Sequence, residues 1–152
     1  DLECLCMLPA DDPLAEKFII TPYDLDAKPM ALLFEEHTTA AQTKAAFELE
    51  GCVLNKRIEL RTFLPGIQFV SAGACFMICD MITAYSHVLQ HGSSENIAIR
   101  RFRPRISNSV SVLTPGYATQ ALVAKNFKDS LIAKIRDMQQ EVTSWLGEHR
   151  DI

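Results

Sequence analysis

Short apolar runs alternate along this chain with segments that carry the three-four spacing of amphipathic helices. Most of the apolar runs have the length of a buried strand and end at proline, glycine or acidic residues. We predict strands at residues 2–8, 18–20, 30–34, 57–60, 75–79, 97–102 and 109–113.

The segments between these strands predict helices. Thr38 or Thr39 is expected to cap a helix that Gly51 ends, and a helix over residues 63–72 is expected to stop at Gly73. Thr21 is expected to cap a single helical turn, and residues 81–88 a short helix. The clearest helix covers about residues 119–145, where the apolar positions are Leu122, Val123, Phe127, Leu131, Ile132, Ile135, Met138 and Val142. The order predicts an α/β fold, a Rossmann-like lobe with a mainly parallel sheet flanked by helices, plus a long C-terminal helix.

Composition narrows the class of protein. The chain has 152 residues, of which 48% are hydrophobic and 22% charged, and this suffices for one domain with a real core. The formal charge of -4 argues against a nucleic-acid-binding surface over the whole domain. No apolar run approaches the roughly 18 residues of a membrane span, and no basic leader is visible. We therefore expect a soluble, cytoplasmic protein with no membrane partner.

The cysteines indicate a reduced interior. Their number is odd: Cys4, Cys6, Cys52, Cys75 and Cys79. Four of the five lie in apolar runs, where cysteine behaves as a small hydrophobic residue. Neither close pair has a second pair at zinc-site spacing, and the four histidines are scattered. We assign no metal and no cofactor.

The candidate binding residues lie where predicted strands run into helices. Glu36, His37, Thr38 and Thr39 occupy one such junction, and helix N-termini there present free N–H groups to an anion. The next junction holds Arg61, Thr62 and Phe63, and an arginine at this point can clamp a carboxylate. A capped helix with solvated charges and an exposed strand-end arginine explain the same residues without a ligand.

Other polar residues give weaker indications. The basic run of Arg100, Arg101, Arg103 and Arg105 is explained by an alternating strand with solvated side chains. Ser71 does not lie in a nucleophile elbow, and no nucleophile stands beside an evident base. We therefore do not expect an enzyme.

The order of the elements and their punctuation resembles the effector-binding domain of LysR-type transcriptional regulators. Residues 12–15, DPLA, are similar to that family's "HPLA" turn, residues 24–25 to its "DL", and residues 69–78 to its "LVAAGLGVAIV" segment, with Cys75 at the second glycine. Residues 80–84, DMITA, are similar to the "DPFTA" of members that respond to opines and related amino acids. Residues 99–104 and the last helix match the return into the first lobe.

The resemblance implies a fold and a function. It implies a periplasmic-binding-protein type II lobe, with residues 1–103 as the second lobe and residues 104–152 as the part returning to the first lobe. Most of the first lobe and the DNA-binding domain would lie outside this chain. The implied ligand is a small carboxylate-bearing effector, bound near the two junctions and Asp80. The implied assembly is a homo-oligomer, a dimer or a tetramer. DNA would be contacted only through the absent domain.

Two alternatives remain open from the residues. One is a small α/β enzyme with a cysteine nucleophile near residue 79. The other is a free-standing solute-binding protein.

Overall fold

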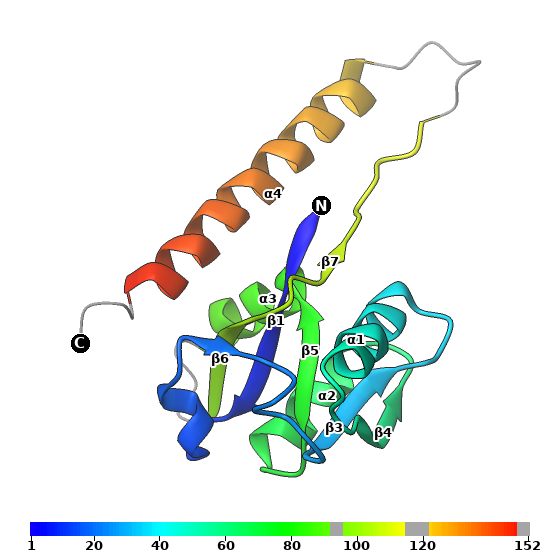
Figure 1. Cartoon of the computed structure of the whole chain (residues 1–152). Helices are drawn as coiled ribbons and strands as arrows, with labels where there is room; N and C mark the ends of the chain where they lie inside the picture. Colours follow the sequence, from blue (N-terminus) through cyan, green and yellow to red (C-terminus); the bar gives the residue numbers. More distant parts are fainter. Residues whose placement is uncertain (92–95, 115–121, 149–152) are drawn as a thin grey trace.

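The computed structural model describes residues 1–91, 96–114 and 122–148. Its elements, in chain order, are β1 (Leu2–Pro9), η1 (Pro13–Glu16), β2 (Ile19–Ile20), β3 (Pro29–Leu33), α1 (Thr38–Leu49), β4 (Asn55–Leu60), α2 (Leu64–Ser71), β5 (Phe76–Asp80), α3 (Met81–His91), β6 (Ile97–Phe102), β7 (Ser107–Asn108) and α4 (Leu122–Glu148). Figure 1 shows their arrangement.

One sheet runs through the molecule in the order β2-β6-β1-β5-β3-β4, and the short β7 pairs with the start of β1. β1 is antiparallel to both neighbours, so Leu5 lies opposite Cys79 of β5 and Arg101 of β6. β3 is parallel to β4 and β5, and β2 is parallel to β6. Within the described residues every strand except β1 therefore points the same way, and the predicted mainly parallel sheet is confirmed.

Alternate residues of β1 divide between two cores, because successive side chains of a strand point to opposite faces. Leu5 and Met7 pack with residues of α2, α3 and the second half of α4. Cys6 and Leu8 pack with residues of η1 and α1. Beyond the sheet, residues 109–114 and the first half of α4 project away from the body (Figure 1).

Two glycines end helices as predicted. Gly51 follows α1 with φ 68° and Gly73 follows α2 with φ 71°, values that residues with a Cβ atom rarely adopt. Gly66 has a different role, because a Cβ atom there would meet Met77 Sδ and would lie 2.7 Å from Leu60 Cδ1. The absence of a side chain at Gly66 therefore lets α2 approach the sheet closely.

Two predicted elements are wrong. Residues 109–113 form no strand, because this segment has left the sheet after β7 and pairs with no described strand. The helical turn expected after Thr21 is a series of turns: the Asp24 carboxylate accepts both the Thr21 N–H and the Thr21 hydroxyl, at 2.9 Å each, and this holds the chain in a tight loop. Parts of the expected loop at 91–94 and of the last helix at 119–121 lie outside the described residues.

The long helix is amphipathic rather than apolar all round. Among the described helices, none combines the length and the apolar content needed to cross a membrane.

Candidate functional site

The carboxyl ends of β5, β3 and β4 meet at one edge of the sheet, because these three neighbouring strands are parallel. Each strand leads there into a helix: β3 into α1, β4 into α2, and β5 directly into α3. In parallel sheets this edge is where ligands bind. The two junctions singled out from the sequence therefore lie side by side.

His37 organises the first junction. Its ring Nδ1 accepts the backbone N–H of Thr39 at 3.2 Å, so His37 is the N-cap of α1, and the expectation of a Thr38 or Thr39 cap is wrong. The first amides of α1 have no acceptor within the helix, and the amide of Thr39 is already paired with the ring.

Aromatic contacts join the two junctions. The His37 ring meets Phe34 edge-on at 5.7 Å between centroids and Phe63 at 6.1 Å. The Arg61 guanidinium lies over the Phe34 ring, 5.6 Å from its centre. Phe63 is buried, whereas Arg61 and Thr62 are exposed. The structure thus brings His37, Arg61 and Phe63 together, with a cation held beside the start of α1.

Thr38 and Thr39 point in different directions. Thr38 is exposed, whereas Thr39 is only 2% exposed, and its Oγ1 is buried without a nitrogen or oxygen partner among the described residues. The Cys4 thiol of β1 lies beside this hydroxyl: burial raises the pKa of Cys4 to about 12, and the neighbouring Thr39 hydroxyl works in the opposite direction. A ligand that approaches from solvent would therefore contact Thr38 rather than the buried Thr39 hydroxyl.

Asp80 has a local partner. Its Oδ1 accepts the backbone N–H of Thr83 at 2.8 Å, and its Oδ2 accepts the Thr83 hydroxyl at 3.1 Å. Both oxygens therefore serve the first turn of α3. Asp80 lies at the same sheet edge as the two junctions, and its carboxylate stabilises a helix start there.

Acidic residues surround the first junction. Glu35 and Glu36 are exposed just before His37. On β4, Glu59 forms an ion pair with Lys56 at 2.8 Å. A groove of about 340 Å³ runs between α1 and the strands β3 and β4, with an apolar floor and Glu35, Lys44 and Lys56 on its rim. The surface around α1 therefore offers charges of both signs.

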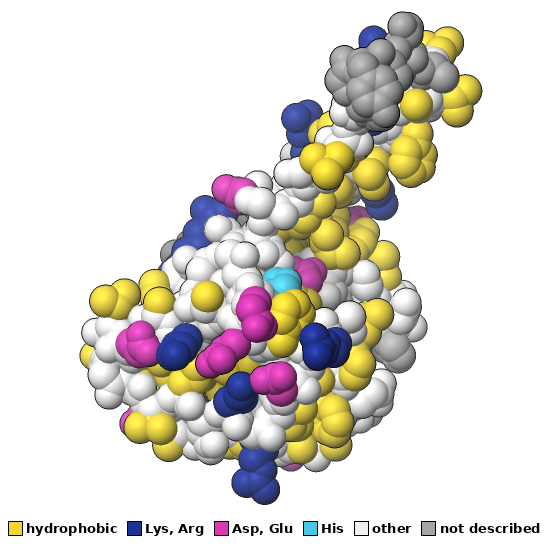
Figure 2. Space-filling model, turned by 90° about the vertical axis from the view of Figure 1, so that its right-hand side faces the viewer, with side chains coloured by type: hydrophobic (Ala, Val, Ile, Leu, Met, Phe, Trp, Pro, Cys, Tyr) yellow, Lys and Arg dark blue, Asp and Glu magenta, His cyan; other side chains and the backbone are white. Residues whose placement is uncertain are grey.

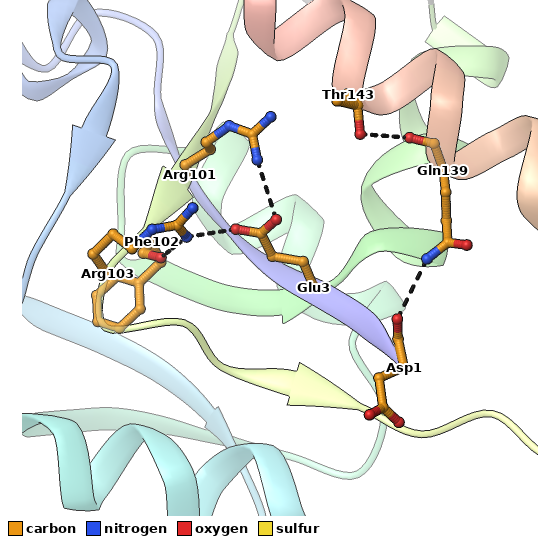
Figure 3. A network of polar contacts seen from close by, with 7 residues as sticks. All are labelled: Asp1, Glu3, Arg101, Phe102, Arg103, Gln139 and Thr143. Atoms are coloured by element: carbon orange, nitrogen blue, oxygen red, sulfur yellow. Dashed lines mark hydrogen bonds and ion pairs between the residues drawn. The ribbon is translucent and has the colours of Figure 1, made fainter.

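The arginine side chains of β6 and of the residue after it were expected to be solvated, but they form contacts within the protein. Glu3 of β1 accepts from Arg101 at 3.1 Å and from Arg103 at 2.5 Å (Figure 3). Arg100 donates to the carbonyl oxygens of Ala15 and Ile99. The only local hint of these roles is a single glutamate inside the apolar run of residues 2–8.

A second polar contact was also not predicted. The carboxamide of Gln42 on α1 donates to the Ser107 carbonyl oxygen at 3.0 Å and accepts the Ser107 N–H at 3.1 Å. Ser107 belongs to β7, which is far from α1 in the chain. No sequence pattern joins these two residues.

The cysteines near the site are poor nucleophiles. Cys79 is fully buried, and burial raises its pKa well above the ordinary value. Burial likewise raises the pKa of Cys75 to about 11. Thiolate is the reactive form, so both thiols are unreactive at neutral pH.

No protein-family model and no curated protein sequence matches the chain. Solved structures do resemble it. The regulatory domain of MetR, a LysR family regulator from N. meningitidis, has a TM-score of 0.56 and 15% identity, over 68% of this chain and 45% of that one. The CcmR regulatory domain of Synechocystis PCC6803, solved with 2-PG, has a TM-score of 0.63 and 15% identity, over 86% of this chain and 62% of that one. The effector-binding domain of QuiR, solved with shikimate, has a TM-score of 0.57 and 12% identity, over 84% and 58%.

The chain therefore has the fold of LysR-family regulatory domains, as the sequence resemblance implied. It spans roughly half of the length of these solved chains.

Proposed function

We propose that this chain is the ligand-sensing part of a LysR-type transcriptional regulator and that it binds a small carboxylate-bearing metabolite. The observation that carries the proposal is the joining of two strand-to-helix junctions, through His37 and Phe63, at the ligand-binding edge of this fold. The fold alone does not identify a function.

Two local features suit an anion. The N-terminus of α1 carries the positive end of the helix dipole, and Thr38 is exposed there. Arg61, held over Phe34, adds a full positive charge from the neighbouring junction. The exposed Glu36 beside them suits an ammonium group, so an amino acid or an opine fits both sets of charges.

Two of the similar structures agree with this class of ligand. QuiR was solved with shikimate, which carries a carboxylate, and CcmR with 2-PG. We place the effector of this chain in the same broad class of small anionic metabolites.

The rest of the regulator is also part of the proposal. We assign residues 1–103 to the second lobe and residues 104–152 to the return into the first lobe. The projecting surface of α4 and residues 109–114 is rich in exposed hydrophobic side chains (Figure 2), among them Val112, Leu113, Phe127 and Leu131. We propose that the remainder of the first lobe covers them, that the regulator is cytoplasmic and homo-oligomeric, and that a separate domain contacts DNA.

The unreactive cysteines disfavour the alternative of an enzyme with a nucleophile near residue 79. Cys79 is enclosed in the core between β1 and β5, where no substrate reaches it.

The test is a thermal-shift screen of amino acids, opines and hydroxy acids against the full-length protein, followed by calorimetric titration. A ligand that binds only the native state raises the unfolding temperature. Arg61→Ala should weaken binding of the selected compound by roughly 1.5 to 3 kcal/mol, the loss expected for a charged hydrogen bond. Arg57→Ala, an exposed change further back on β4, is the matched control and should leave affinity unaltered.

Two results would count against the proposal. One is a screen in which no compound raises the unfolding temperature. The other is unchanged affinity in Arg61→Ala, which would move the ligand away from these junctions.

A further inference from the structure

We propose that Gln42 is a positioning residue that couples the anion site at the start of α1 to the segment that leaves the sheet after β7. The inference rests on the proposed function, because it concerns how occupancy of that site is transmitted. It is carried by the paired hydrogen bonds between the Gln42 carboxamide and the backbone of Ser107, at 3.0 and 3.1 Å.

The geometry of the pair is that of a strand neighbour. The Gln42 carboxamide donates to the Ser107 carbonyl and accepts the Ser107 N–H, as a peptide group of an adjacent strand would. On its other side, β7 pairs with β1, where Glu3 lies opposite Ser107 and Leu2 opposite Asn108. β7 is therefore held between β1 and one side chain of α1.

β7 is also short, so few contacts hold it. It contains only Ser107 and Asn108. Just before it, the Ile106 carbonyl accepts the Cys4 N–H at 2.8 Å, and just after it residues 109–114 run on without regular structure. Two of the few bonds that hold this exit point come from Gln42, so their loss should be felt locally.

Gln42 lies one turn beyond the residues that start α1. The turn between them is tied, because the Thr43 hydroxyl donates to the Thr39 carbonyl at 2.8 Å and the His37 ring caps the helix. Because α1 is a single hydrogen-bonded helix of 12 residues, we expect its first turn and Gln42 to move together. An anion drawn to the amides near Thr38 therefore shifts or steadies Gln42 as well, and through it Ser107.

Hydrogen exchange of the full-length protein, with and without inorganic phosphate, tests the coupling. Phosphate is the probe because it binds free amides at helix N-termini. Gln42→Met keeps the length of the side chain and removes both bonds. Without phosphate, the Ser107 amide should exchange roughly threefold to tenfold faster in this variant, the ratio for the one net hydrogen bond that its N–H loses. Gln42→Glu keeps an acceptor for the Ser107 N–H, so its exchange rate at this amide should lie between those of the wild type and Gln42→Met.

With phosphate, the wild type should show slower exchange in residues 38–41 and also in residues 107–114. In Gln42→Met only residues 38–41 should respond. Leu49→Ala, an exposed and uncharged change on the same helix, is the control and should behave as the wild type.

The outcomes that overturn the coupling are distinct from those that overturn the site. Two outcomes would show that the coupling alone is wrong. In the first, exchange of residues 107–114 still slows with phosphate in Gln42→Met. In the second, phosphate slows exchange of residues 38–41 but leaves residues 107–114 unchanged in every protein, the wild type included. If phosphate leaves the exchange of residues 38–41 unchanged in all of the proteins, the anion site is wrong, and the coupling that depends on it is wrong as well.

Discussion

The rings of Tyr85 and Trp145 stack nearly parallel, with centroids 5.5 Å apart and planes 10° apart. Tyr85 belongs to α3, which packs on the sheet, and Trp145 to the last turns of α4. Met138 and Val142 of α4 are buried in the same core. The second half of α4 is thus attached to the body, and the stack is one of the contacts near the end of the helix.

Tyr85→Ala should loosen this attachment. The loss of a buried aromatic ring should lower the free energy of unfolding by about 3 kcal/mol. Trp145 is the only tryptophan of the chain, so its fluorescence reports directly on the docking of α4 and should shift to longer wavelength in the variant. Tyr23→Ala is the control, because Tyr23 is 66% exposed, and it should leave the emission unchanged. An unchanged spectrum in Tyr85→Ala would show that α4 docks without the stack.

Gly66→Ala should destabilise the protein because the added Cβ atom has no room between α2 and the side chains of Met77 and Leu60. Overpacking of this kind costs about 1 to 3 kcal/mol, which denaturant titration resolves. Gly147→Ala is the matched change in a helix with open space around it, and there alanine should stabilise α4 slightly. Equal stability of the two variants would mean that α2 can move away from the sheet at little cost.

The five cysteines should differ sharply in reactivity. Burial raises the pKa of Cys4 to about 12 and of Cys75 to about 11, and it also raises the pKa of Cys6 and Cys79. Cys52 is only partly buried, so a thiol reagent at neutral pH should modify this residue slowly and the other four only after denaturation. Cys52→Ser should therefore abolish labelling of the native protein. Rapid modification of Cys79 instead would support the enzyme alternative.

Asp24 should make the native state sensitive to acid. Burial raises the pKa of its carboxyl group, but hydrogen bonds from Lys17 and Thr21 outweigh this and leave the pKa below its ordinary value. A lowered folded pKa contributes stability that is complete above the unfolded value of about 3.9 and is lost as the pH falls through the folded one.

Unfolding midpoints measured across pH test this sign. Asp24→Asn should be less stable than the wild type at neutral pH, and the difference should shrink below about pH 4. The exposed change Asp11→Asn serves as control and should show a smaller difference. A gap that stays constant with pH would mean that the carboxylate charge of Asp24 is not what matters.

Most elements could be predicted because their signals are local. The three-four spacing of α4, the apolar runs of β1 and β5, and the glycine stops at Gly51 and Gly73 all depend on neighbouring residues only. The strand predicted at 109–113 failed for the opposite reason: its alternating pattern suits a strand, but a strand also needs a partner.

The site could be predicted only in part. The junctions followed from the order of strands and helices, and the structure places them together. That Thr39 points inward to Cys4, while Thr38 points outward, depends on how α1 sits on the sheet, which its own sequence does not specify. The pairing of Glu3 with Arg101 and Arg103, and of Gln42 with Ser107, joins residues that are distant in the chain and share no local pattern.

The central place of β1 has a consequence for the order of folding. Among the described strands β1 comes first in the chain, yet its two long neighbours in the sheet, β5 and β6, come much later. Closing such long loops is slow, since their entropy is lost before the contacts that reward it are made. Until Phe102 has left the ribosome, the apolar residues of Leu2–Pro9 lack one of the two strands that flank them in the sheet, and we expect chaperones to bind this nascent segment during that time.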